Sequence, residues 1–133
     1  MKGKWLLLTG CALLLCGCSV QKNDMEKMRD IEFTVVDEYK LPVELKEYIE
    51  EAKKEPFELT YGDEGYLYIA KGYGRKETSG YSIEVEDCFE TSNVICMRTN
   101  LLGPPKTEKI LEEETFPYIV LKIEYSDKSV VFE

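Results

Sequence analysis

Histidine is absent from this sequence of 133 residues. Its absence excludes Ser-His-Asp and Cys-His catalysis, and it removes the histidine ligands on which most zinc sites depend. Paired carboxylates could still run glycosidase chemistry. However, the acidic residues alternate with apolar ones on expected strands, or gather in a loop at 112–114. We therefore expect that the chain is not an enzyme and that it holds no metal ion and no cofactor.

Basic residues are few relative to acidic ones. The chain has 17 Lys and Arg residues against 26 Asp and Glu residues. Once an expected leader that contains Lys2 and Lys4 is removed, 15 basic residues remain and the net charge is −11. A surface this acidic repels nucleic acid and anionic lipid head groups. We expect no nucleic-acid partner, and no electrostatic adhesion to a membrane.

Residues 1–17 are predicted to be a secretory signal peptide. Lys2 and Lys4 form a short positive segment, a short apolar stretch follows, and small residues come after it. This layout is too short and wrongly flanked for a helix that spans a bilayer.

The segment Leu15-Cys16-Gly17-Cys18 resembles the lipobox of bacterial lipoproteins. The resemblance implies that Cys18 receives a diacylglyceryl group and becomes the mature N-terminus. Cys11 fits the same pattern, but cleavage there would leave an apolar stretch of only about four residues. An ordinary secreted protein with a free Cys18, or an uncleaved signal anchor, stays open as an alternative. Each buried methylene contributes about 0.8 kcal/mol, so lipidated Cys18 would hold the chain at the extracytoplasmic face of the cell membrane.

The mature chain divides into a tether and a domain. Residues 18–30 are polar and lack a strand pattern, which predicts the lipidated Cys18 followed by a flexible tether. Residues 31–133 have the length of a single domain. Apolar residues at helical spacing predict a helix over 41–54, with Pro42 in its first turn and Pro56 just after its end.

The rest of the chain is predicted to form strands. Segments rich in Val, Ile, Tyr and Phe, separated by turn residues, lie at 31–36, 57–61, 66–71, 81–89, 94–101, 118–125 and 129–132. We expect an α+β fold: one N-terminal amphipathic helix on a mostly antiparallel β-sheet, or on a partly closed barrel, of about six or seven strands.

Two central strands allow a prediction of register. A three-residue loop at 91–93 would place Val85 opposite Thr99, and Glu86 opposite Arg98. It would also place Cys88 directly opposite Cys96 on the solvent-facing side. The two thiols could then form a disulfide after export, or remain unpaired. Without histidine they make a poor zinc site.

The loop at 72–80 is rich in glycine and basic residues. A phosphate-binding loop is disfavoured, because the terminal Gly-Lys-Ser/Thr is missing and a strand rather than a helix follows. The ordinary interpretation is a tight connection in which Gly80 has a positive φ, Thr78 and Ser79 bond nearby backbone, and Tyr81 seals the core.

The stretch 72–85, GYGRKETSGYSIEV, resembles the signature of the PrcB family of bacterial lipoproteins. The matching positions are Gly74, Lys76, Thr78, Gly80, Tyr81, Ser82 and Ile83. Pro104-Pro105 and the strand that opens with Pro117-Tyr118 are similar to two further elements of that family. The chain differs at Glu77 and at Ser79, where the family usually has proline and glycine, so a less rigid loop is expected.

The resemblance implies a function. The family takes its name from a lipoprotein subunit of a cell-surface protease complex. A non-catalytic module that binds an envelope or secreted protease is therefore expected, with a proteinase inhibitor that uses the 72–80 loop as the alternative. The candidate partner-binding residues are Tyr73, Arg75, Lys76, Thr78, Gly80 and Tyr81, since Tyr and Arg are favoured at interfaces.

Overall fold

A computed structural model describes residues 26–106 and 109–133. The predicted signal peptide, Cys18 and most of the predicted tether lie outside these residues. The elements are β1 (Arg29–Asp30), β2 (Thr34–Val35), the short 3-10 helix η2 (Glu38–Lys40), α2 (Val43–Ala52), β3 (Pro56–Asp63), β4 (Tyr66–Tyr73), β5 (Ser82–Glu90), β6 (Val94–Leu102), β7 (Tyr118–Glu124) and β8 (Ser129–Phe132).

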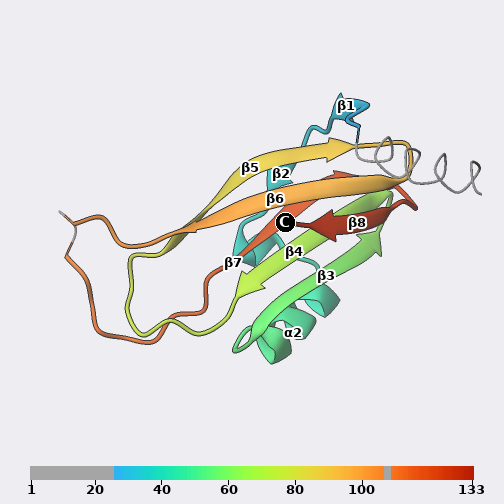
Figure 1. Ribbon diagram of the computed structural model, residues 1–133. Coiled ribbons are helices and arrows are strands. Elements are labelled where there is room, and N and C mark those ends of the chain that lie inside the picture. The colour runs from blue at the N-terminus through green and yellow to red at the C-terminus, as the bar shows by residue number, and fades with distance from the viewer. Residues whose placement is uncertain (1–25, 107–108) are drawn as a thin grey trace, which may run out of the picture.

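The strands form two four-stranded sheets with the helix on one side (Figure 1). The first sheet has the order β1-β5-β6-β8, and the second has the order β2-β7-β4-β3. All pairs are antiparallel except β6 with β8, which is parallel. The predicted α+β class with one α-helix and mostly antiparallel strands is confirmed.

The prediction of one sheet or a partly closed barrel with six or seven strands is wrong. Within the described residues there are two open sheets and eight strands. The strand count differs because the segment expected to form one strand at 31–36 does not form a continuous strand. Only Thr34–Val35 pairs with β7, while Arg29–Asp30, at the end of the predicted tether, pairs with β5 in the other sheet. This segment thus crosses from one sheet to the other instead of extending either one.

Two apolar clusters hold the three layers together. The first lies between the sheets and includes Ile69, Leu121 and Ile95. The second lies between the β2-β7-β4-β3 sheet and α2, and includes Leu45 and Ile49. Alternating side chains of β4 and β7 point to opposite faces, so these two strands serve both clusters.

Helix α2 is shorter than predicted but lies where the sequence pattern placed it. It spans Val43–Ala52, and Pro42 occupies its N-cap position. Leu45 and Ile49, four residues apart, are buried against the sheet, while Val43 and Tyr48 are exposed on the outer side. In the part of the chain that is described, no helix has the length and apolar character needed to cross a membrane.

The β5–β6 hairpin has the predicted register in one half only. Ile83 lies opposite Leu101 and Val85 opposite Thr99, as expected. Nearer the turn the register is shifted by one residue, because the Thr91 N–H donates to the Val94 carbonyl at 2.9 Å and leaves only two residues to turn the chain. A bulge between Val85 and Asp87 absorbs the extra residue.

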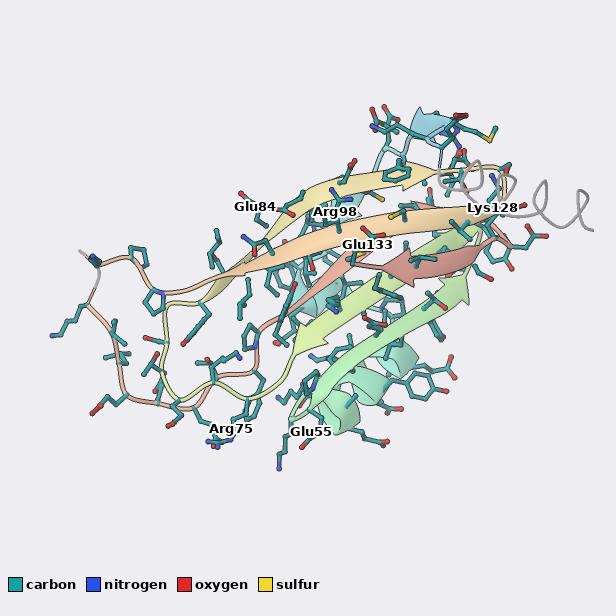
Figure 2. The ribbon with its side chains drawn as sticks, in the orientation of Figure 1. Glu55, Arg75, Glu84, Arg98, Lys128 and Glu133 are labelled. Carbon is teal, nitrogen blue, oxygen red and sulfur yellow. The ribbon has the colours of Figure 1, made fainter. Side chains whose placement is uncertain are left out.

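The shift changes two predicted pairs. Arg98 lies opposite Asp87 rather than Glu86. Its guanidinium forms its ion pair with Glu133 at the end of the chain, at 3.1 Å (Figure 2). Cys88 lies opposite Met97, and Cys96 lies opposite Phe89.

Candidate functional site

Two connections run side by side beyond one end of the sheets and form an arm (Figure 1). Residues 74–81 join β4 to β5, and residues 103–117 join β6 to β7. We call these two segments, apart from residues 107–108, the paired-loop arm. It lies at the end of the molecule opposite β1 and Lys128 (Figure 2).

Backbone hydrogen bonds join the two segments. Lys76 and Thr115 form an isolated antiparallel bridge, with N–H to carbonyl distances of 2.8 and 2.9 Å. The Ser79 N–H donates to the Leu111 carbonyl at 2.9 Å. The arm is therefore a paired structure, because each loop satisfies backbone groups of the other.

Side-chain hydrogen bonds strengthen this pairing. The Ser79 Oγ accepts a bond from the Leu111 N–H at 2.9 Å, and the Thr115 Oγ1 donates to the Thr78 carbonyl at 2.8 Å. Arg75 Nη1 lies 3.0 Å from Glu114 Oε2. Ser79, which replaces the usual glycine of the PrcB signature, thus gains a bond that a glycine could not make.

Gly80 is required by the geometry of the arm. Its φ is +95°, a backbone conformation that residues with a side chain rarely adopt. A Cβ at this position would also lie 2.8 Å from Pro104 Cβ. Gly80 and Pro104 therefore pack the two loops closely where the arm leaves the sheets. The predicted positive φ at this position is confirmed.

The base of the arm is fixed to the rest of the molecule. The Tyr73 N–H donates to the Pro117 carbonyl at 3.0 Å, and the Tyr73 hydroxyl shares a hydrogen bond with Thr99 of β6. The Arg75 N–H donates to the Lys54 carbonyl, just after α2, at 3.3 Å. The arm is thus attached to both sheets and to the helix end.

The structure brings the predicted partner-binding residues together, but mainly as the framework of the arm. Lys76, Thr78, Gly80 and Tyr81 are half-buried, like Tyr73. Arg75 alone among the six is exposed, and its guanidinium is paired with Glu114. Most of these residues therefore hold the shape of the arm instead of facing outward.

The second loop supplies the exposed surface, which the sequence-based prediction missed. Residues 109–114 are all exposed. Among them Ile110 is 44% and Leu111 is 52% exposed, and Leu102, just before the loop, is 40% exposed. An adjacent apolar pair inside an otherwise charged loop was the available signal, since such residues are costly to expose without a partner.

The candidate disulfide between Cys88 and Cys96 is not present. Both thiols are free and buried. Because Cys88 shares a face of the hairpin with Met97, and Cys96 shares the other face with Phe89, the two side chains point in opposite directions. Burial raises the pKa of the Cys88 thiol to about 11 and also raises the pKa of Cys96. The prediction that they face each other on the solvent side was wrong, because it assumed the unshifted register.

Within residues 26–106 and 109–133, no three acidic or cysteine side chains gather closely enough to hold a metal ion. The arm offers hydrogen-bonded backbone, one ion pair and exposed apolar side chains. This arrangement can bind a protein surface, because it combines a preformed shape with apolar contact area.

One comparison with known proteins gives a match, and it covers the arm. Residues 67–124 match the family model described as PrcB C-terminal. No curated protein and no solved structure matches the chain. The matched segment begins one residue into β4 and ends with β7. It therefore contains both loops of the arm, all of β5, β6 and β7, and all of β4 except Tyr66.

Proposed function

Because residues 67–124 of this chain match the PrcB C-terminal family model, we propose that it is a non-catalytic protein-binding module. In this proposal a lipid on Cys18 holds the module at the extracytoplasmic face of the membrane. The partner is an envelope or secreted protease, which the module helps to assemble or stabilise. The observation that carries the proposal is the paired-loop arm.

The arm supports protein binding in two ways. Its shape is set before any partner arrives, by the Lys76–Thr115 bridge and the bonds between Ser79 and Leu111, so little ordering entropy would be lost on docking. Its outer loop exposes Ile110 and Leu111, which would become buried in a complex. Apolar side chains beside charged ones are the usual composition of a docking surface.

The position of the arm fits an anchored protein. The described chain begins near β1, at the end of the molecule away from the arm (Figure 1). Arg29 follows Cys18 by 11 residues, and a chain of that length reaches at most about 40 Å. A lipid on Cys18 would therefore keep the β1 end within about 40 Å of the bilayer and leave the arm, at the other end, accessible to a second envelope protein.

Co-purification from cell envelopes tests the proposal. Full-length protein carrying Ile110→Ser and Leu111→Ser is compared with wild type and with Val43→Ser, a control that alters a more exposed apolar residue on α2. We expect a protease to co-purify with wild type and with the control. The arm variant should retain at most about a tenth of it, since truncating a hot-spot residue at the centre of an interface costs about 2 kcal/mol or more. Recovery of the same protease with the arm variant would contradict the proposal.

The same proteins separate assembly from inhibition. If the module stabilises its protease, adding wild-type protein should leave proteolysis unchanged or lengthen the lifetime of the activity. An inhibitor would instead lower the activity, and deletion of residues 75–79 would restore it.

Cell fractionation tests the anchor independently. Wild-type protein is expected in the membrane fraction, and Cys18→Ser in the soluble or unprocessed fraction. The mass of the mature N-terminal peptide should include two acyl chains on Cys18. An unmodified Cys18 in membranes would refute the lipid anchor without affecting the argument about the arm.

A further inference from the structure

A second surface lies at the end of the molecule opposite the arm. It is a cleft with a volume of about 1020 Å³. One wall is the segment that crosses between the sheets, residues 29–34, which we call the N-terminal strap. The other wall includes Tyr66, Lys122 and Tyr125, and the buried side chains of Ile95 and Ile123 also line the cleft.

The strap is fixed to both sheets, so the cleft is preformed. The Met28 N–H donates to the Glu90 carbonyl at 2.8 Å and the Ile31 N–H to the Cys88 carbonyl at 3.0 Å. After the strap, the Val36 N–H donates to the Val120 carbonyl of the other sheet at 2.9 Å. A ligand would therefore find both walls already in place.

Three aromatic side chains line the cleft and remain accessible. Phe33 is 40%, Tyr66 is 41% and Tyr125 is 58% exposed. Lys122 Nζ lies 4.1 Å from the centre of the Tyr66 ring and helps to fix its position. Gly62 leaves room for Tyr125, because a Cβ at this position would lie 3.2 Å from Tyr125 Cε1. The rings of Tyr66 and Tyr125 are thus held in position although they are not buried.

Carboxylates dominate the polar part of the lining. Four acidic residues line the cleft against two basic ones, Arg29 and Lys122; the acidic residues are Asp30, Glu32, Glu90 and Glu124. Arg29 is paired with Glu90, and Lys128 Nζ lies 2.7 Å from the same carboxylate. Asp30 is paired with Lys27 at 2.9 Å, so Arg29, Lys27, Lys122 and Lys128 balance the four acidic residues. The cleft therefore has no net charge that would favour an anion or a cation. Charged walls also disfavour a hydrocarbon chain.

We propose that this cleft binds a neutral oligosaccharide. A sugar ring presents apolar C–H faces, which suit exposed aromatic rings, and hydroxyl groups, which donate to carboxylates. Phe33, Tyr66 and Tyr125 supply the first kind of contact, and Glu32 and Glu124 supply acceptors for the second. Neither acid belongs to an ion pair formed among the described side chains.

The inference is independent of the proposed protein-binding function, because the arm lies at the other end of the molecule (Figure 1). Two sources could supply such a ligand: a glycan strand of the cell wall, or the head group of a glycolipid in the membrane. The shared chemistry is an uncharged, hydroxyl-rich ring.

A titration followed by NMR tests the proposal with the full mature chain. The probe is an oligomer of N-acetylglucosamine, and an oligomer of a uronic acid serves as the anionic counterpart. We expect saturable shifts at Tyr66, Tyr125 and the strap with the first probe and none with the second. Vesicles with and without a neutral glycolipid distinguish the sources: retention by glycolipid vesicles alone indicates the head group, and binding of the soluble oligomer indicates the wall glycan.

Variants assign the binding to the aromatic wall. Tyr125→Ala should weaken the affinity about tenfold, whereas Tyr125→Phe, which keeps the ring, should retain most of it. Tyr39→Ala removes a more exposed aromatic ring outside the cleft and should have no effect. The proposal is overturned if neither the soluble oligomer nor the glycolipid vesicles bind, if the anionic oligomer binds as well as the neutral one, or if Tyr39→Ala weakens binding as much as Tyr125→Ala does. Because these readouts do not involve residues 109–114, a failure here leaves the function of the arm unaffected.

Discussion

The contact between Gly80 and Pro104 predicts how strongly the arm depends on one glycine. Replacing Gly80 by alanine introduces two costs: a side chain at a φ of +95°, and a Cβ 2.8 Å from Pro104 Cβ. Two other glycines separate these costs. Gly65 has a φ of +83° with nothing within 4 Å of its added Cβ, and Gly103 has open space and no positive φ.

The expected magnitudes follow from this series. Gly103→Ala should be neutral, or stabilising by up to about 1 kcal/mol, because it restricts the unfolded chain. Gly65→Ala should destabilise by about 1–2 kcal/mol through its backbone conformation alone. Gly80→Ala should cost this amount and a further 1–3 kcal/mol (approximately) for overpacking against Pro104.

Native-state hydrogen exchange is the appropriate measurement, because the arm can open without unfolding of the sheets. The amides of Lys76, Ser79, Leu111 and Thr115 bridge the two loops. In Gly80→Ala these four amides should exchange much faster, while the amides of β4 and β7 keep their protection. Denaturant unfolding then reports the part of the loss that reaches the whole molecule.

The opposite outcome would be that the four bridging amides are as well protected from exchange in Gly80→Ala as in Gly65→Ala. That result would mean that the loops are not held together at Gly80 and Pro104. It would also weaken the case for a preformed arm, because the hydrogen bonds farther out would have to maintain the pairing without this contact.

Three further predictions concern the interior of the molecule. Leu121→Ala should lower the free energy of unfolding by about 2–5 kcal/mol, because Leu121 is fully buried between the sheets. Cys88 and Cys96 should resist alkylation in the folded chain at pH 8 and react after denaturation, since burial raises both pKa values. Lys128→Met should reduce the free energy of unfolding at neutral pH, because Lys128 and Arg29 hold the pKa of Glu90 below its ordinary value of 4.5. The stabilisation from the ionised Glu90 is present above pH 4.5 and is lost as the pH falls further.

Each of these has a contradicting outcome. A loss below about 1 kcal/mol for Leu121→Ala would mean that the sheets do not pack as described. Labelling of either thiol at the rate of an unfolded peptide would place it at the surface. An unchanged dependence of stability on acid pH in Lys128→Met would show that Glu90 does not depend on that ammonium group.

Local patterns were sufficient for several features. The apolar spacing of Leu45 and Ile49 predicted the helix, and runs of β-branched and aromatic residues predicted the long strands, because these patterns reflect side-chain geometry within a few residues. The PrcB signature at 72–85 was also recognisable, and residues 67–124 match the family model described as PrcB C-terminal. The positive φ of Gly80 followed from the conformational freedom of glycine in a tight connection between strands.

Sequence reasoning failed where the outcome depended on distant partners. Whether Thr91 belongs to the β5–β6 ladder or to its loop decides the register near the turn, and that choice determined the orientation of Cys88 and Cys96. A shift of one residue moves a side chain to the opposite face of a sheet, so a small local error reversed the conclusion about the disulfide.

The sequence by itself determined the composition of this protein: its acidity, its lack of histidine, its helix, its strand-forming segments and its family signature. Only the tertiary structure decided how the strands divide between two sheets, and that the loop around Gly80 is paired with a second loop about 30 residues later. The physical reason is that strand and loop pairing depends on backbone groups, which every residue carries. Side-chain patterns can predict that a segment is extended, but the contacts that form along the folded chain select its partner.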